Sequence, residues 1–281
     1  MHRTHWKIGE KLIDLTERAL LMGVLNLTPD SFSDGGEFLA TEAAVKHALE
    51  MAQNGADVID IGGESTRPGA KPIPPNEEME RVLPVIERLA GAGEFLLSID
   101  TSTASVARAA LAAGAHIIND VTGGRNDPAM FALAAETGAG LIIMHMQGTP
   151  ETMQLNPSYD DVVCEVADFF RQQLAEAVRS GVDPMCIAFD PGIGFGKTVA
   201  HNLELLANLP RLRVEDRPLV VGVSRKSFLG KIAGLPPDRT SATIGLTSFL
   251  RERGAQVLRV HDVAANASAL RTTEAVLAAA R

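Results

Sequence analysis

Residues 186–197, CIAFDPGIGFGK, set the pattern on which the whole chain is built. Cys186 to Phe189 is a short apolar run, long enough for a buried strand, and it ends abruptly in Asp190, Pro191 and a glycine-rich turn. A carboxylate at the carboxyl end of a buried strand, just before a loop that can approach a ligand closely, is typical of binding sites in α/β folds. The segment therefore predicts a buried strand that presents one polar side chain to a candidate site.

The glycines of this segment do not form a nucleotide-binding fingerprint. Residues 196–198, GKT, match the end of a phosphate-binding loop, but that motif needs a glycine five positions before Gly196, where the chain has Pro191. The three glycines at alternate positions also lack the spacing of a dinucleotide fingerprint. The plain alternative is a tight turn, for which glycine is the usual residue.

The same order of apolar run, polar residue, glycine and helical stretch recurs along the chain. Continuous apolar strands that alternate with helices indicate a parallel sheet covered on its outer face. Eight such units predict an α/β protein with a (β/α)8 TIM barrel. An open doubly wound sheet is the alternative, but it more often carries a glycine fingerprint at its first turn, where this chain reads NLTPD (26–30). The expected strands are 20–25, 58–61, 95–99, 116–118, 141–144, 186–189, 219–223 and 257–260.

Helical spacing of apolar residues predicts helices between these strands, most clearly within 43–52, 79–86, 161–178 and 264–280. Residues 6–16 alternate in polarity and predict a short N-terminal β-hairpin before the barrel. We expect residues 1–281 to form one barrel domain, because no interdomain linker is visible. Two long loops, 28–37 and 64–75, follow strand ends, and long loops in a compact domain are commonly lids over a site.

Composition narrows the functional class. The net charge of −9 and the pI near 5.3 argue against a general nucleic-acid binder. The first seven residues lack the apolar core of a signal peptide, and no run approaches the length of a membrane span. Cys164 and Cys186 have no metal-like spacing, and we expect two buried, unbridged thiols. These features predict a cytoplasmic protein with small-molecule substrates and with no nucleic-acid or membrane partner.

Polar side chains at the strand ends form the candidate site. Each has a plain alternative, since Asp is a common helix cap and Arg259 and His261 could pair with a structural carboxylate. In barrel enzymes, however, such positions face one shared pocket. The full set is Asn26, Thr66, Arg67, Asp100, Asn119, His145, Asp190, Ser224, Lys226, Arg259 and His261.

The set divides by its chemistry. Asp100, Asn119 and Asp190 suit the amino and N–H edge of a flat heterocycle, with the cation of Lys226 beside them. A second group, Arg67, Arg259 and His261, supplies donors for a phosphate-like group. Asn26 carries a neutral oxygen that suits magnesium beside substrate phosphates. The residues therefore predict a pocket for a polar heterocycle at one end and for a magnesium-bound pyrophosphate at the other.

Seven segments, in order across residues 20–263, resemble the motifs of dihydropteroate synthase, a family of pterin-binding (β/α)8 barrels. Two of them are long and specific: MGVLNLTPDSFSDGG (22–36) and DIGGESTRPG (60–69). The others are INDV (118–121), MHMQG (144–148), DPGIGFGKT (190–198), GVSRKS (222–227) and RVHDV (259–263).

The resemblance implies a transferase of folate biosynthesis, usually a homodimer, that depends on magnesium. Such an enzyme joins p-aminobenzoate to 6-hydroxymethyl-7,8-dihydropterin diphosphate through a carbocation-like displacement, giving 7,8-dihydropteroate and pyrophosphate. It implies catalytic roles for Asp100, Lys226, Arg259 and His261, and a pterin site of Asp100, Asn119, Val121, Met144, Asp190 and Lys226. The pyrophosphate positions are Asn26, Arg67, Arg259 and His261, with Asn26 as the metal ligand, and the p-aminobenzoate positions are Phe32, Thr66, Pro68, Phe195 and Ser224.

One departure from the family pattern is visible, and two alternatives stay open. Many relatives carry a lysine near the start of the helix that follows Asp100, where this chain has Ser102 and Thr103, residues expected to cap that helix. One alternative function is a methyltetrahydrofolate–corrinoid methyltransferase, which shares pterin recognition but needs no pyrophosphate site. The other is a non-catalytic paralogue that binds or regulates. The p-aminobenzoate positions match the family, which predicts sensitivity to sulfonamides.

Overall fold

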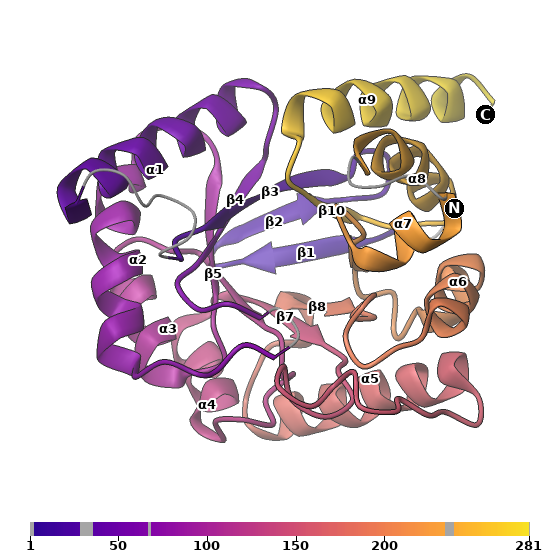
Figure 1. Cartoon of the computed structure of the whole chain (residues 1–281), viewed down its shortest axis with the longest axis horizontal. Coiled ribbons are helices and arrows are strands. Elements are labelled where there is room, and N and C mark those ends of the chain that lie inside the picture. Colours follow the sequence, from indigo (N-terminus) through magenta and orange to yellow (C-terminus); the bar gives the residue numbers. More distant parts are fainter. Residues whose placement is uncertain (1–2, 29–35, 67–68, 234–238, 281) are drawn as a thin grey trace.

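The computed structural model describes residues 3–28, 36–66, 69–233 and 239–280, and within them the chain forms a closed parallel barrel ringed by helices (Figure 1). Each strand pairs in parallel with its neighbours in the order β8-β7-β6-β5-β4-β3-β10-β9. A parallel bridge between Phe189 and Leu219 joins the two outer strands of this order and closes the ring. The strands are β3 (Leu20–Asn26), β4 (Val58–Gly62), β5 (Leu96–Asp100), β6 (Ile117–Asp120), β7 (Gly140–Met144), β8 (Ile187–Asp190), β9 (Val220–Gly222) and β10 (Val257–Val260).

Helices follow the strands and cover the outside of the barrel (Figure 1). They are α1 (Gly36–Gln53), α2 (Pro75–Leu89), α3 (Ala104–Ala112), α4 (Ala129–Thr137), α5 (Val162–Arg179), α6 (Val199–Ala207), α7 (Ser227–Ala233), α8 (Thr240–Glu252) and α9 (Val263–Ala279). The (β/α)8 prediction and the eight strand positions are confirmed, and the open-sheet alternative is wrong because the sheet closes. None of the described helices is long and apolar enough to cross a membrane.

Period-two alternation along each strand separates the barrel interior from the layer beneath the helices. On β4, for example, Ile59 and Ile61 pack in the large cluster that contacts the helices, whereas Val58 packs in a smaller inner cluster. Asp60 lies two residues after Val58 and therefore points into the barrel. The inner layer is apolar near the amino ends of the strands and polar near their carboxyl ends.

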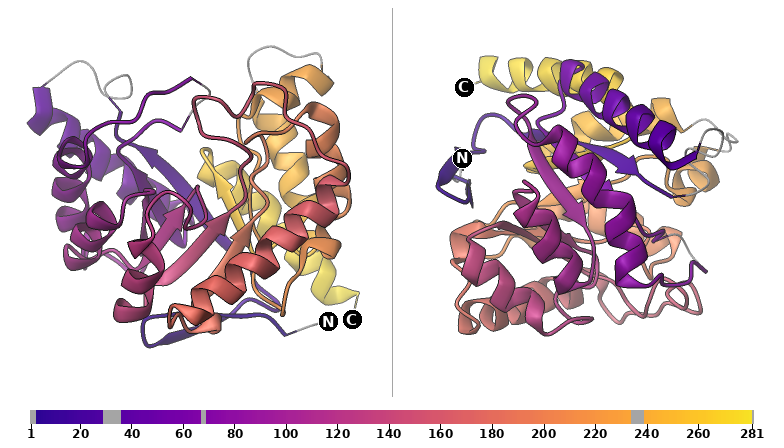
Figure 2. Two further views of the ribbon diagram at one scale, coloured as in Figure 1. Left: turned by 90° about the horizontal axis from the view of Figure 1, so that it is seen from below. Right: turned by 90° about the vertical axis from the view of Figure 1, so that its left-hand side faces the viewer.

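The predicted N-terminal hairpin is confirmed as β1 (His5–Ile8) paired in antiparallel with β2 (Lys11–Asp14). It lies across one end of the barrel, while the loops that follow the strands gather at the other end (Figure 2). Trp6 and Ile8 pack against the apolar inner layer, and Trp6 Nε1 donates to Cys186 O at 2.8 Å. The hairpin therefore covers the amino end of the barrel, opposite the loops at the carboxyl ends of the strands.

Two local expectations were wrong. Cys186 is buried, as predicted, but Cys164 is exposed, because it lies on the solvent side of α5. Thr103 stands at the N-cap of α3 without a side-chain capping bond. Instead, Asp127 in the loop after β6 accepts from Ala104 N at 2.9 Å, which satisfies a free N–H of this helix end.

Candidate functional site

A network of four polar side chains fills the carboxyl end of the barrel interior. Arg259 on β10 donates from Nε to Asp60 Oδ2 at 2.6 Å and from Nη2 to Asp100 Oδ2 at 2.7 Å. Asn119 on β6 donates from Nδ2 to the same Asp60 oxygen at 3.0 Å. The barrel thus brings together three predicted residues, Arg259, Asp100 and Asn119, around Asp60, which the sequence analysis did not select.

The charges of this network perturb one another. Burial raises the pKa of Asp100 to about 7, although the Arg259 guanidinium acts in the opposite direction. Burial alone lowers the pKa of Arg259, but the carboxylates of Asp60 and Asp100 outweigh burial and raise it. Asp100 is therefore a carboxyl group whose charge changes near neutral pH, beside a cation that stays charged.

A second group lies around the glycine-rich loop that follows β8. Asp190 Oδ1 accepts from Gly192 N at 2.7 Å, which fixes the carboxylate at the start of the loop. Lys226, in the loop after β9, donates to Ile193 O, and its ammonium lies 4.4 Å from the centroid of the Phe195 ring. The predicted residues Asp190, Lys226 and Phe195 are therefore neighbours at the barrel mouth.

Burial also sets the charges of this group. It lowers the pKa of Lys226 to about 8, while the nearby Asp190 carboxylate opposes the change. Burial raises the pKa of Asp190, and Lys226 opposes that change in turn. Two buried groups of opposite charge whose pKa values move toward each other are typical of a functional site.

His261 and Ser224 form a third, smaller group at the ends of β10 and β9. The Ser224 hydroxyl lies 3.0 Å from His261 Nδ1, and the backbone N–H of His261 donates to the same oxygen at 3.1 Å. His261, two positions along the chain from Arg259, therefore contacts Ser224 at the ends of neighbouring strands.

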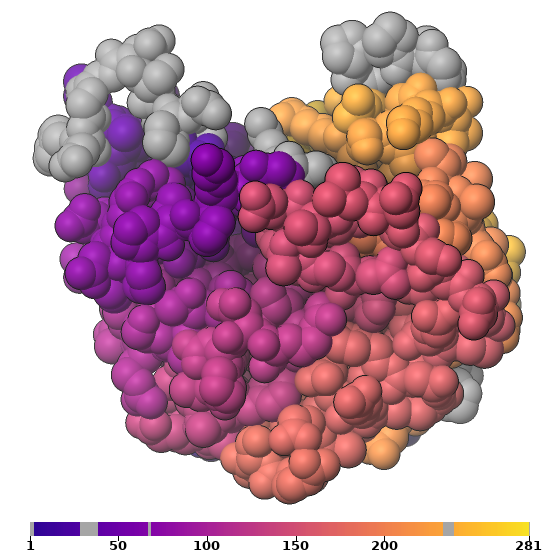
Figure 3. Space-filling view, turned by 60° about the horizontal axis from the view of Figure 1, so that its bottom comes forward, coloured from indigo at the N-terminus to yellow at the C-terminus, as the bar shows by residue number. Residues whose placement is uncertain are grey.

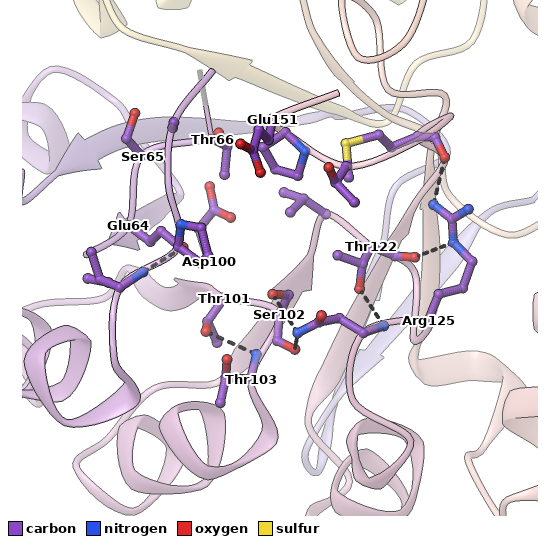
Figure 4. A pocket seen from close by; sticks show the side chains of 18 of the residues that line it. Glu64, Ser65, Thr66, Asp100, Thr101, Ser102, Thr103, Thr122, Arg125 and Glu151 are labelled. Atoms are coloured by element: carbon purple, nitrogen blue, oxygen red, sulfur yellow. Dashed lines mark hydrogen bonds between the residues drawn. The ribbon is translucent and has the colours of Figure 1, made fainter. Parts of the chain in front are cut away.

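A cavity of about 400 Å³ opens beside Asp100. This volume lies in the range of small-molecule sites. Its walls come from the loops after β4, β5, β6 and β7 and include Glu64, Thr66, Asp100, Val121, Arg125 and Glu151. Figure 4 shows Glu64, Thr66, Asp100 and Glu151 on one side of the cavity and Arg125 on the other.

Two loops meet over this cavity. Gly69 N, in the loop after β4, donates to Pro150 O in the loop after β7 at 3.1 Å. Figure 3 shows these segments side by side, purple against crimson, on this face of the molecule. The described part of the predicted 64–75 lid therefore does lie at the cavity.

An apolar cluster borders the polar groups. Val121 and Met144, both predicted for the pterin slot, pack with Met146 and Met153, and Phe195 packs against them. Methionine side chains adapt to irregular flat surfaces, so this cluster suits one face of a planar ring.

Some predicted positions are not brought together. Thr66 lines the cavity, but Phe195 and Ser224 contact Lys226 and His261 instead. The other predicted positions of the p-aminobenzoate and pyrophosphate groups, Phe32, Arg67 and Pro68, lie outside the described residues.

Asp60 and Glu78 are among the buried carboxyl groups that sequence reasoning missed. Asp60 is hidden in the apolar run VIDIG, but its position two residues after Val58 marks it as inward-facing once the barrel is assumed. Glu78 lies on α2, is only 1% exposed, and accepts a hydrogen bond from the Thr101 hydroxyl. It stands four positions before Val82 on the apolar face of this helix, which is the signal that could have found it.

The donor set for magnesium is small. Among the described residues there is no group of three or more His, Cys, Asp or Glu side chains that could hold a metal ion. Asn26 Oδ1 and the Asp100 side chain both border Gly62, at 3.8 Å and 3.5 Å from the place where a Cβ of residue 62 would lie. Such a set fits a magnesium ion that keeps water and substrate phosphate as most of its ligands, because magnesium commonly binds through one or two protein oxygens.

Comparisons with known proteins point to one family. The family model described as pterin binding enzyme matches residues 22–261. The chain is 45% identical over 260 residues to dihydropteroate synthase of Escherichia coli K12, covering 92% of each chain. It is 44% identical to a solved dihydropteroate synthase of Xanthomonas albilineans with 4-aminobenzoic acid, with a TM-score of 0.91 and 99% of each chain covered. A second structure of that protein, in complex with 7,8-dihydropteroate, gives a TM-score of 0.87 at 42% identity and covers 98% of this chain and 99% of that one.

Proposed function

Since the chain belongs to the dihydropteroate synthase family of pterin-binding enzymes, we propose that it condenses p-aminobenzoate with 6-hydroxymethyl-7,8-dihydropterin diphosphate. The products are 7,8-dihydropteroate and pyrophosphate, so the protein is a transferase. The proposal is supported by how the polar residues at the barrel mouth divide between recognition of a heterocycle and of an anion.

One observation carries the assignment of the pterin site. Asp100 is buried, and its Oδ1 atom has no hydrogen-bond partner among the described residues. A buried carboxylate oxygen without a donor is costly, and native proteins rarely leave one so. The amino and ring N–H groups of a pterin supply such donors. We place the ring among Asp100, Asn119, Asp190 and Lys226, with Val121 and Met144 against its face.

The charge of Asp100 suits the chemistry of this substrate. Departure of pyrophosphate leaves positive charge on the methylene carbon and the pterin ring. An ionised Asp100 beside the ring stabilises that charge, because it is already fixed in a buried setting and needs no reorganisation. The reaction then forms the bond from the p-aminobenzoate nitrogen to the methylene carbon, and the nitrogen releases one proton.

Arg259, His261 and Arg67 are proposed to bind the pyrophosphate. Arg259 has its Nη2 on Asp100 in this structure, so it can approach the anion only by sharing or releasing that contact. Asn26 would hold a magnesium ion, which when bound offsets the negative charge of the leaving group. The charged ring and the leaving anion are thus stabilised by different residues of one site.

The p-aminobenzoate site is proposed at Phe32, Thr66, Pro68, Phe195 and Ser224. Phe195 provides an aromatic face beside Lys226, and the Ser224 hydroxyl provides a polar contact for a carboxylate. A sulfonamide analogue of p-aminobenzoate should compete for this site. We further propose a cytoplasmic homodimer with magnesium as its cofactor.

The test is pyrophosphate release by the purified chain with the pterin diphosphate and magnesium, with and without p-aminobenzoate. Release that requires p-aminobenzoate and yields 7,8-dihydropteroate supports the proposal. Lys226→Ala should abolish it, because the substitution removes the only described cation in contact with the Phe195 ring. Lys231→Ala, which changes an exposed lysine of α7, is the matched control and should leave the rate unchanged.

Other outcomes separate the alternative functions. Tight pterin binding without pyrophosphate release under either condition would contradict the proposal. Methyl transfer from methyltetrahydrofolate to a corrinoid partner would then identify the methyltransferase, and binding without any turnover would identify a non-catalytic protein.

A further inference from the structure

The glycine-rich loop after β8 is held by side chains rather than by a regular ladder. Four successive carbonyl groups of this loop each accept a hydrogen bond from a side chain. The pairs are Lys226 Nζ to Ile193 O, Gln154 Nε2 to Gly194 O at 2.9 Å, Lys197 Nζ to Phe195 O at 3.0 Å, and Tyr159 Oη to Gly196 O at 2.7 Å. The position of the loop, and of the Phe195 ring on it, therefore depends on these donors.

Lys197 is the most buried of the four donors, with only 3% of its surface exposed. An ammonium group has three N–H donors. Besides Phe195 O, its neighbours are His145 Nδ1 at 3.0 Å and His145 O at 3.3 Å, so all three donors have acceptors. Because His145 follows β7 directly, Lys197 ties the glycine-rich loop to the end of the neighbouring strand.

The partners of this ammonium are neutral. Burial lowers the pKa of His145 to about 2, so its ring is uncharged and Nδ1 can accept. The other charged or titratable groups facing Lys197 are Asp190, Lys226, Arg125 and the ring of Tyr159, whose centroid lies 6.0 Å away. Burial lowers the pKa of Lys197 itself to about 7, and Asp190 is the group that favours its charge.

A buried cation without a contacting carboxylate carries a large desolvation penalty. An apolar side chain of similar volume is commonly neutral or stabilising at such a position. Packing alone therefore does not account for a lysine here. What a lysine adds is a donor for Phe195 O and a positive charge that acts on Asp190 together with the charges of Lys226 and Arg259.

We propose that Lys197 is a positioning residue of the site, which fixes Phe195 beneath the Lys226 ammonium and adds a positive charge near Asp190 to those of Lys226 and Arg259. This inference rests on the proposed pterin and p-aminobenzoate sites. Lys197 itself does not touch either substrate, and its effect passes through the carbonyl of Phe195 and the carboxylate of Asp190.

The experiment compares Lys197→Met with Tyr159→Phe. Lys197→Met removes the buried charge and the hydrogen bond to Phe195 O. The control, Tyr159→Phe, removes the hydrogen bond to Gly196 O without changing a buried charge. Affinity for the dihydropterin diphosphate is measured without p-aminobenzoate, by fluorescence, from acid to alkaline pH. The KM for p-aminobenzoate is measured in parallel.

Pterin affinity should fall on acidification, and this fall is the acid limb of its pH profile. For Lys197→Met, the acid limb should move to higher pH by about one unit, the size that one neighbouring charge commonly produces. The KM for p-aminobenzoate should rise about tenfold, because the Phe195 carbonyl loses its hydrogen bond from Lys197. A tenfold change corresponds to about 1.4 kcal/mol. Tyr159→Phe should leave the acid limb in place. Asp100 also titrates in this range, but Lys197 is not among the largest influences on its pKa, whereas it is one of the charges that lower the pKa of Asp190, so the displacement reports mainly on Asp190.

A folded Lys197→Met protein with an unmoved acid limb and an unchanged KM would overturn the proposal. If that variant does not fold, Lys197→Gln and Lys197→Arg replace it, and only the neutral glutamine should move the acid limb. Equal profiles for these two variants would equally overturn it. If the unsubstituted chain binds the pterin but forms no product, the proposed function fails, while the comparison of pH profiles still decides the role of Lys197.

Discussion

Replacing Glu78 with glutamine should change how the stability of the barrel depends on pH. Glu78 is 1% exposed, and its Oε1 atom has no partner among the described residues. Burial raises its pKa from 4.5 to about 7, although the hydrogen bond from Thr101 acts against the change. Glutamine has nearly the same shape and cannot ionise, so the substitution isolates the charge.

The sign follows from proton binding. Between pH 4.5 and about 7 the folded state holds a proton on Glu78 that the unfolded chain has released. The free energy of unfolding therefore falls as pH rises through this window. The pKa of Glu78 in the folded state exceeds its ordinary value by about 2.5. At about 1.4 kcal/mol for each pKa unit, the full effect on the free energy of unfolding is about 3 kcal/mol. Between about pH 5 and about pH 8 most of it, about 2–3 kcal/mol, is expressed.

Urea unfolding at these two pH values gives the measurement, for the unsubstituted chain, for Glu78→Gln and for Glu80→Gln. The last changes an exposed glutamate of the same helix and serves as the control. Any packing cost of the glutamine amide is the same at both pH values, so it cancels in the difference. Relative to the unsubstituted chain, Glu78→Gln should be about 2–3 kcal/mol more stable at the higher pH than at the lower one.

Equal pH dependence in all three proteins would refute the reasoning, because it would mean that Glu78 is ionised in the folded state. The substitution has a second consequence at the site. The Glu78 carboxylate contributes to the raised pKa of Asp100, so Glu78→Gln should move the acid limb of pterin affinity to lower pH. No such movement is expected for the control.

Three further predictions concern the network, the mouth and the base of the barrel. In a double-mutant cycle measured by urea unfolding, Arg259→Met and Asp60→Asn should show a coupling energy of about 1.5–3 kcal/mol, the size expected for a hydrogen bond between charged groups. If the free-energy changes of the two substitutions simply add, the network is contradicted. Pterin affinity should fall as pH rises through about 8, where Lys226 loses its charge, and the fall should be absent in Lys226→Met. Trp6→Ala should destabilise the chain by about 3–5 kcal/mol but leave kcat of the folded protein unchanged, because the hairpin lies at the far end of the barrel from the site; a lower kcat would show that the two ends are coupled.

Strand positions could be predicted from the sequence because each buried strand is a continuous apolar run that ends in a polar residue. The same rule located Asp100 and Asp190, which stand at the ends of β5 and β8. It failed for Asp60, which lies inside the run of β4, where only the direction of the side chain distinguishes it from its neighbours. That direction depends on the closure of the barrel, which a single strand does not specify.

The contacts of Arg259 and Lys197 could not be read from the sequence for a related reason. The residue type of Arg259 predicts an anion as its partner, but its partners in the structure, Asp60 and Asp100, come from strands about 160 to 200 positions away. In the sequence, the lysine of GFGK suggests only the end of a phosphate-binding loop. Its actual partner, His145, lies 52 residues earlier and becomes a neighbour only because β7 and β8 pair.

In the proposed site, recognition of the ring and recognition of the anion would share one group, Asp100. Asp100 has Arg259 on one oxygen, while its other oxygen has no donor among the described residues. A pterin that donates to the free oxygen offsets the loss if Arg259 turns toward the pyrophosphate, and Asp60 continues to anchor the guanidinium through Nε. If the ring bound without a diphosphate, Arg259 would stay hydrogen-bonded to Asp100. If the diphosphate bound without the ring, Asp100 would lose the hydrogen bond from Arg259 and gain no donor in return. On the proposed assignment, the two halves of the substrate would support each other's binding through one carboxylate, and the site would favour the intact pterin diphosphate over either fragment.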